Sequence, residues 1–131
     1  MLHVYLLIVF AAVVVLVDGI GCLVSIRFNM RYARWIPVSM FFYGLMGFAA
    51  CVVGGWQFTI SSGAYVGLVD ATLGWGTSWM LGPGRLPAGT LNIKTWLGIA
   101  SVNVAIGCAA FSIAGGLARY FQAHGFGAYR G

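Results

Sequence analysis

Residues 2–26, LHVYLLIVFAAVVVLVDGIGCLVSI, decide the fold class of this chain. Asp18 is the single charged residue in this stretch of about 25. An α-helix needs about 20 apolar residues to cross the hydrocarbon core of a bilayer. The stretch lacks a basic segment before it and a small-residue cleavage site after it, so we interpret it as a retained membrane span rather than a signal peptide.

The composition of the whole chain agrees with a membrane setting. Of its 131 residues, 61% are hydrophobic and 7% are charged, whereas a soluble domain carries about 25% charged residues. A soluble domain of this size could not bury so much apolar surface. We therefore expect one domain, residues 1–131, whose main solvent is lipid.

Three further apolar stretches complete a predicted bundle of transmembrane helices. We expect spans at about residues 2–26, 37–58, 62–81 and 95–117, which make an all-α integral membrane fold of about four helices. Pro37 is tolerated in a first helical turn, and the Gly- and Pro-rich segment 82–94 is typical of a loop. The tail, 118–131, contains the short, polar and glycine-rich segment FQAHGFGAYRG at 121–131, which we expect to fray.

The positive charges are concentrated in the connections between these spans. Five of the seven cations lie in two short connections: Arg27, Arg31, Arg34, Arg85 and Lys94. The positive-inside rule places such connections in the cytoplasm. We expect a multi-pass protein of the bacterial inner membrane, anchored by these residues, with both termini outside. No basic stripe lies on a soluble module, which argues against nucleic-acid binding.

A re-entrant segment at residues 62–81 gives a competing topology. Arg85 and Lys94 would then lie outside and the other five cations inside, so charge counting fits both topologies equally well. The length of this segment, and Trp75 and Trp79 near its end, favour a full span.

The two halves of the sequence also share short similar segments. Residues 16–18 and 68–70 both read LVD, and GFAACVVGG at 47–55 resembles GCAAFSIAGG at 107–116. A duplication would give two parallel two-helix hairpins related by an axis along the membrane normal. Chance matches are common in sequence this rich in Ala, Gly and Val, so both interpretations stay open.

Both acidic residues of the chain, Asp18 and Asp70, fall inside predicted spans. A carboxylate at the bilayer centre costs about 2.5–3.5 kcal/mol on insertion scales and usually marks a functional site. Helical spacing puts both on faces of small residues, and Asn103 is the best internal hydrogen-bond partner. The alternatives are a protonated Asp that fixes helix register through hydrogen bonds, and an arginine that bends back from a basic connection toward Asp18.

Small residues recur about every four positions on the later spans. Such rows let helix backbones approach closely in lipid. Four short helices cannot bury all these rows against one another, so we predict self-association or contact with other membrane subunits. The predicted helix-packing residues are Gly47, Cys51, Gly55, Gly63, Gly67, Gly74, Gly107, Ser112 and Gly116.

Patterns typical of enzymes, metal sites and cofactor sites are missing from the sequence. His3 and His124 lie near opposite ends, and the three cysteines form no CxxC pair. We therefore expect no catalytic residues, no metal and no cofactor. The leading function is a small oligomeric protein that moves protons, ions or small cations through Asp18, Asp70 and Asn103. The alternative is an accessory or scaffold subunit of a larger membrane complex.

Overall fold

The computed structural model describes residues 1–82, 89–90 and 92–125, and this part of the chain is helical without strands. It contains three helical stretches that are long and apolar enough to cross a membrane: Leu2–Arg27, Tyr32–Leu81 and Ile93–Ala123. The all-α class and the presence of membrane-type helices are confirmed. The predicted count of four helices is not confirmed, because Tyr32–Leu81 forms one apolar stretch in which a kink at Gly55 joins two helical parts.

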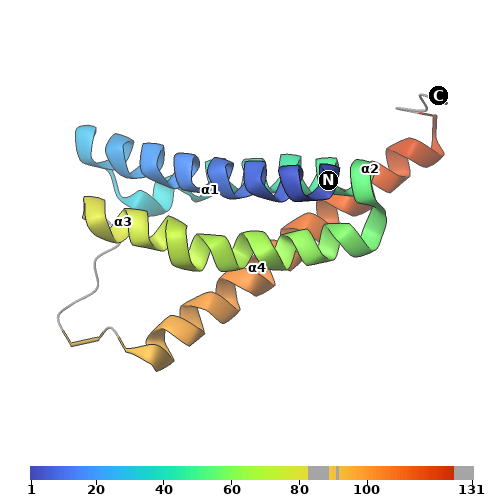
Figure 1. The fold of residues 1–131 in the computed structure, drawn as a ribbon. Coiled ribbons are helices and arrows are strands. Elements are labelled where there is room, and N and C mark those ends of the chain that lie inside the picture. The colour runs from blue at the N-terminus through green and yellow to red at the C-terminus, as the bar shows by residue number, and fades with distance from the viewer. Residues whose placement is uncertain (83–88, 91, 126–131) are drawn as a thin grey trace.

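Helix α1, Leu2–Arg27, follows the first predicted span closely (Figure 1). Its buried face includes Val14, Asp18, Cys22 and Ser25, which recur at helical spacing. Asn29 has a φ of 50° in the turn that ends the helix, a conformation that Asn tolerates better than most residues.

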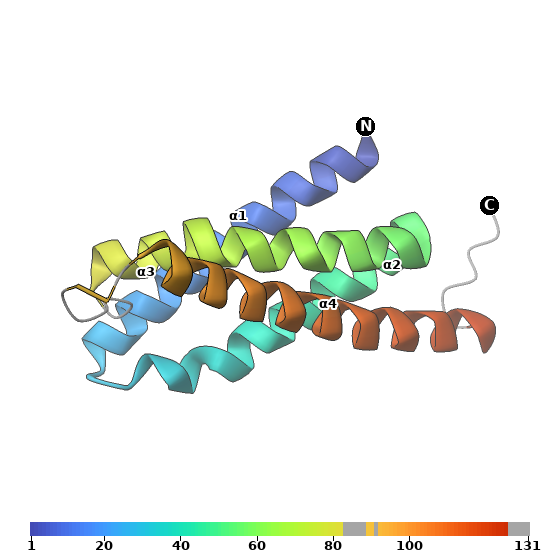
Figure 2. The same ribbon diagram turned by 90° about the horizontal axis from the view of Figure 1, so that it is seen from below.

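The middle stretch begins with a short 3-10 helix, η1, Tyr32–Trp35, and continues as α2, Ile36–Val69. Gly55 interrupts α2 with a φ of 73° and a ψ of −169°, which glycine adopts without steric cost. The chain reverses its direction in this region, so that the second part of α2 runs back along the bundle (Figures 1 and 2). The predicted break, residues 59–61, lies slightly too late.

The second part of α2 leads into a π-helix and then a last α-helical piece. The π-helix η2 covers Asp70–Gly74, and α3 covers Trp75–Leu81. A π turn holds an extra residue and is found in helices mainly as a single turn, frequently at functional sites.

Helix α4, Ile93–Ala123, begins at Asn92, whose side chain accepts a hydrogen bond of 2.9 Å from the backbone N–H of Thr95. The helix continues to Ala123, six residues beyond the end of the fourth predicted span and three residues into the segment 121–131 that we expected to fray. Ala118 is fully buried, and the Arg119 guanidinium lies 5.9 Å from the ring centre of Trp56. These contacts stabilise the extra turns, and the remainder of the predicted tail, from 126, lies outside the described residues.

The helix directions put the connections at opposite ends of the bundle. The start of α1 and the end of α4 lie at one end, together with the reversal in α2 (Figures 1 and 2). The η1 segment, the end of α3 and the start of α4 lie at the other end.

Close backbone contact between α2 and α4 holds the centre of the bundle. A Cβ atom placed on Gly63 would lie 2.7 Å from the carbonyl oxygen of Gly107, and one on Gly67 would clash with the carbonyl oxygen of Asn103. Only glycine allows backbones to pack so closely. Beside this crossing, a core of apolar side chains joins α1, α2 and α4: Phe10, Val14, Tyr43, Met46, Ala50, Val66, Val69 and Phe111.

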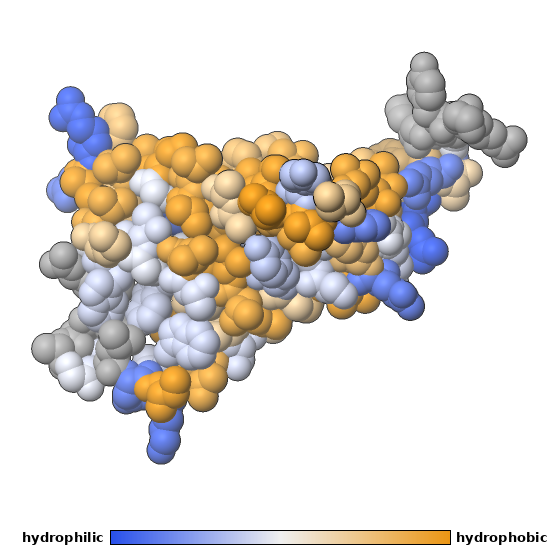
Figure 3. Space-filling view, in the orientation of Figure 1, coloured by the Kyte–Doolittle hydropathy of each residue, from blue (hydrophilic) through white to orange (hydrophobic). Residues whose placement is uncertain are grey.

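Apolar side chains cover much of the helical surface on the face shown in Figure 3. Large side chains such as Leu16, Phe41, Leu68 and Ile113 are exposed. In water such a surface would drive aggregation, whereas in a bilayer it faces hydrocarbon. The protein is therefore a membrane protein by the character of its helices.

Candidate functional site

Asp18 lies on the inward face of α1 and is 7% exposed. The Tyr32 hydroxyl, carried by η1, donates a hydrogen bond of 3.0 Å to Oδ1 of Asp18. The neighbouring Trp35 donates from its indole Nε1 to the carbonyl oxygen of Val17, at 3.0 Å. Two aromatic side chains thus fix η1 against the turn of α1 that carries the acid.

Asp70 is the first residue of the π-helix η2 and lies partly buried inside the bundle. Tyr43, from the first part of α2, donates a hydrogen bond of 2.7 Å from its hydroxyl to Oδ2 of Asp70. Tyr43 is itself buried. Each acid therefore has one tyrosine hydroxyl as a donor, and each tyrosine comes from a different element.

The two carboxyl groups meet above Gly74. A Cβ atom on Gly74 would clash with Oδ2 of Asp18 and lie 2.6 Å from Oδ1 of Asp70. Both carboxyl groups therefore lie next to the backbone of the same residue. Glycine at position 74 leaves the space in which the acids of two separate helices approach.

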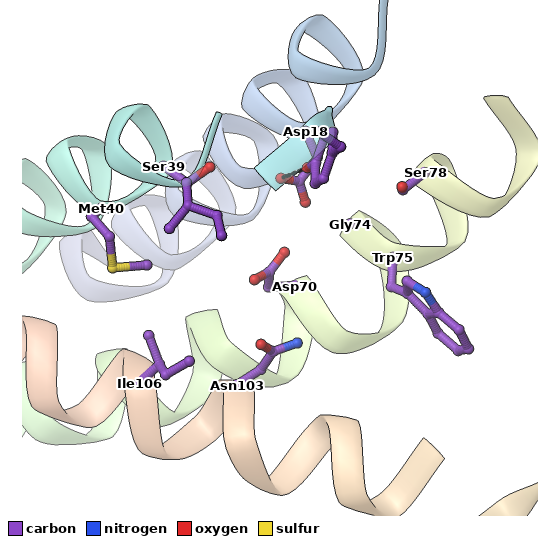
Figure 4. Close-up of a pocket in the computed structure, with 11 residues that line it drawn as sticks. Asp18, Ser39, Met40, Asp70, Gly74, Trp75, Ser78, Asn103 and Ile106 are labelled. Carbon is purple, nitrogen blue, oxygen red and sulfur yellow. Dashed lines mark hydrogen bonds between the residues drawn. The ribbon is translucent and has the colours of Figure 1, made fainter. Parts of the chain in front are cut away.

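A cavity of about 260 Å³ lies next to the acid pair (Figure 4). Polar and aromatic side chains line it together with apolar ones, and they come from α1, η1, the first part of α2, η2, α3 and α4. Besides Asp18, Asp70 and Gly74, the lining residues are Tyr32, Ile36, Ser39, Met40, Trp75, Ser78, Asn103 and Ile106.

Asn103 lies on the side of the cavity formed by α4, facing the region of Asp70 (Figure 4). Among the residues that the structure describes, its amide makes no direct hydrogen bond with either carboxyl group. The three predicted site residues thus line one cavity, and Asn103 faces the cavity without a direct hydrogen bond to either acid.

The cations that the structure describes form no ion pair with the acids. Arg27, Arg31, Arg34 and Lys94 are exposed, and no ion pair forms within residues 1–82, 89–90 and 92–125. Arg85, also predicted as an anchor, lies outside the described residues. The partner that Asp18 receives from the first basic connection is the hydroxyl of Tyr32 rather than an arginine.

Tyr32 and Tyr43 are partners of the acids that the sequence alone did not predict. By sequence, Tyr32 belongs with the interfacial aromatics of the first connection, and Tyr43 is one more residue of an apolar span. A signal was available for Tyr43, because a tyrosine in the middle of a membrane span needs a hydrogen-bond partner for its hydroxyl.

The predicted packing residues divide into two groups. Gly47, Cys51, Gly63, Gly67 and Gly107 lie at contacts between helices; Gly47 faces the backbone of Phe111, and the Cys51 thiol donates to the carbonyl oxygen of Gly115 at 3.4 Å. Gly74 faces the acids instead. Gly55 lies in the reversal, Ser112 is half-buried, and Gly116 is exposed with open space around it.

The similarity between the two halves of the sequence has a counterpart in the hydrogen bonds beside the acids. Trp35, just before α2, bonds the carbonyl oxygen of the residue before Asp18. Trp96, in the first turn of α4, donates from Nε1 to the carbonyl oxygen of Ala71, the residue after Asp70, at 3.3 Å. In both halves, an indole at the start of the returning helix is bonded to the backbone next to an acid.

Within the described ranges, no group of three or more His, Cys, Asp or Glu side chains could hold a metal ion. No protein-family model, curated protein or solved structure matches this chain.

Proposed function

We propose that this protein moves protons, ions or small cations across a membrane through a site built on Asp18 and Asp70, with Asn103 in support. The observation that carries the proposal is the convergence of both carboxyl groups over Gly74, beside a cavity of about 260 Å³. The chain has no other acid, so its whole negative charge is concentrated at this point.

The chemistry of a close carboxyl pair supports proton or cation exchange. Two carboxyl groups close together in a medium of low dielectric constant cannot both be ionised at low cost, so under this proposal the pair holds one proton between them. The hydroxyls of Tyr32 and Tyr43 donate to them and stabilise the negative charge that remains. A cation that enters the cavity replaces the shared proton, which couples the two species.

A purely structural role for the acids explains less. Hydrogen bonds between membrane helices contribute about 0.6 kcal/mol on average, while each charged carboxyl costs about 2.5–3.5 kcal/mol to insert. Packing alone also gives no reason for an open cavity beside Asp18 and Asp70 or for a glycine that keeps the space between them clear.

We also propose that the stretch Tyr32–Leu81 crosses the bilayer twice, which gives the chain four crossings. Its 50 residues would extend about 75 Å as one straight helix, over twice the ~30 Å of the hydrocarbon core, and the reversal at Gly55 allows two crossings. Arg27, Arg31, Arg34 and Lys94 then share the cytoplasmic side of a bacterial inner membrane, in agreement with the positive-inside rule.

A flux assay in liposomes tests the transport proposal. The wild type, Asp18→Asn and Asp70→Asn are reconstituted, and proton uptake driven by a potassium diffusion potential is followed with a pH-sensitive dye. Both substitutions keep the side-chain volume and remove the titrating group, so we expect flux to fall by about tenfold or more.

The matched control for this assay is Ser101→Ala. Ser101 is exposed on α4, and its hydroxyl bonds only the carbonyl oxygen of Leu97 in the same helix. Flux that is the same in the wild type and in both Asn variants, with protein correctly inserted, contradicts the proposal.

One observation favours the second candidate, an accessory or scaffold subunit. Gly98 and Gly116 on α4 have no atom within 4 Å of a Cβ placed on them, so α4 presents small residues away from its own bundle. Such surfaces suit contact with another membrane helix, in a homo-oligomer or in a larger complex. Purification in mild detergent separates these cases: a stable homo-oligomer supports transport, and stability only with other polypeptides supports the subunit role.

A further inference from the structure

The cavity beside the acid pair has a mouth of apolar side chains on the outer surface of the bundle. Ile36, Met40 and Ile106 line it and are 53%, 37% and 38% exposed. They belong to α2 and α4, within the stretches that are apolar enough to cross a membrane. When these helices cross a bilayer, an opening between the apolar surfaces of α2 and α4 gives a ligand access from the lipid.

The inner end of the same cavity carries the carboxyl groups of both acids. Asp18 and Asp70 converge there, and within the part of the chain that the structure describes no lysine or arginine forms an ion pair with them. Ser39 and Ser78 add hydroxyl groups, and Trp75 and Tyr32 add aromatic rings. Carboxylates together with aromatic rings are the groups that bind organic ammonium ions.

The size of the cavity narrows the class of ligand further. Its volume of about 260 Å³ is several times the ~30 Å³ that one water occupies in the liquid, so it is larger than a dehydrated inorganic ion requires. It lies just below the range of about 300–1,000 Å³ of pockets for drug-sized molecules. A single small organic molecule fits these limits.

We propose that the cavity binds a small amphipathic organic cation, an ammonium group with an apolar substituent, that enters from the bilayer between α2 and α4. The ammonium group lies against Asp18 and Asp70, and the apolar part lies toward Met40 and Ile106. This inference rests on the proposed function in one respect, because it takes the acid pair as the working site, and it names the substrate class of that site.

A binding assay with defined probes tests the ligand class. The full-length protein in lipid nanodiscs is titrated with radiolabelled benzyltrimethylammonium in a scintillation proximity assay. Unlabelled benzyltrimethylammonium, its neutral isostere neopentylbenzene, tetramethylammonium and sodium ion serve as competitors. We expect saturable binding, with competition by the neutral isostere, tetramethylammonium and sodium weaker by about tenfold or more, because each lacks either the charge or the apolar group.

Two variants and one control locate the site. Asp70→Asn is expected to weaken binding by about tenfold or more through loss of the charge. Ile106→Trp is expected to narrow the mouth and slow association by about tenfold. Ser101→Ala, exposed elsewhere on α4, is expected to leave binding unchanged. Since Ile106→Trp keeps both acids, it tests the entry route even if Asp70→Asn fails to fold.

Several results would overturn this inference. Absence of saturable binding to the wild type would do so, as would equal competition by sodium, tetramethylammonium or the neutral isostere. Unchanged association in Ile106→Trp would refute entry through the mouth. Proton flux that requires Asp18 and Asp70 without binding of benzyltrimethylammonium would overturn the ligand class alone, whereas acid-independent flux would remove the proposed function.

Discussion

The substitution Gly74→Ala directly tests whether the space between the carboxyl groups matters. The added methyl would clash with Oδ2 of Asp18 and lie 2.6 Å from Oδ1 of Asp70. Neither oxygen can move away freely, because Tyr32 and Tyr43 hold the two carboxyl groups through hydrogen bonds of 3.0 and 2.7 Å. The acids must therefore separate, and at least one tyrosine bond must lengthen or break.

These contacts set the magnitude of the effect. Overpacking a well-filled site costs about 1–3 kcal/mol, and a lost hydrogen bond to a charged group costs about 1.5–3 kcal/mol. Some of the strain is relieved by movement of the side chains, so we expect Gly74→Ala to lower the free energy of unfolding by about 1–3 kcal/mol. Under the proposed function, we expect proton flux in liposomes to fall by about tenfold or more, because the two acids are forced apart.

Gly76→Ala is the matched control for this variant. Gly76 lies two positions further along in α3, and a Cβ atom there meets nothing within 4 Å. The substitution is expected to leave flux unchanged and to stabilise the helix by about 0.5–1 kcal/mol. Unfolding by SDS in mixed micelles measures both stabilities. Equal stability of the two variants, or full flux in Gly74→Ala, would refute the reasoning about the acid pair.

Three further predictions concern packing, hydrogen bonding and topology. The added methyl of Gly67→Ala would clash with the carbonyl oxygen of Asn103, so this variant should lower the free energy of unfolding by about 1–3 kcal/mol in SDS titrations. Its control is Gly116→Ala, which lies in open space and should not lower the free energy of unfolding. A Gly67→Ala variant as stable as the wild type would contradict the close α2–α4 crossing. Tyr43→Phe removes the donor to Asp70 and should cost about 1–3 kcal/mol by the same measurement while the packing of the ring is kept, and no loss would mean that another group satisfies the carboxyl. A reporter fused to the C-terminus should give a signal outside the cytoplasm if the chain crosses four times, and a cytoplasmic signal would contradict that topology.

The class of the fold could be predicted because it depends on length and composition alone. Residues 2–26 are apolar for long enough that a membrane helix is the natural outcome, and the structure agrees within one residue for α1. The reversal at Gly55 was less predictable, since Gly54, Gly63 and Gly67 offered the same chain flexibility nearby. Its position depends on which glycine is free of helix contacts, which is a tertiary property.

The acid pair was predictable only in part. Burial of Asp18 and Asp70 within helices could be deduced from the cost of a charge in lipid, but their meeting depends on how the helices run beside one another. The role of Tyr32 as a donor could not be predicted without the structure of η1. Tyr32 and Trp35 are both aromatic residues of one short connection, yet Tyr32 bonds the carboxyl group of Asp18 and Trp35 bonds the backbone of Val17. Local sequence does not distinguish them.

The π-helix at residues 70–74 allows one continuous segment to pack against two different helices. In a regular α-helix each residue advances about 100° around the axis, so positions 63, 67 and 74 would share a face. The wider π turn changes the direction in which the next residues point, and Gly63 and Gly67 face α4 while Gly74 faces α1. The extra residue of this turn thus brings Gly74 round toward Asp18. Deletion of one residue between Asp70 and Gly74 would turn the downstream segment away from Asp18 while both acids and Gly74 are kept.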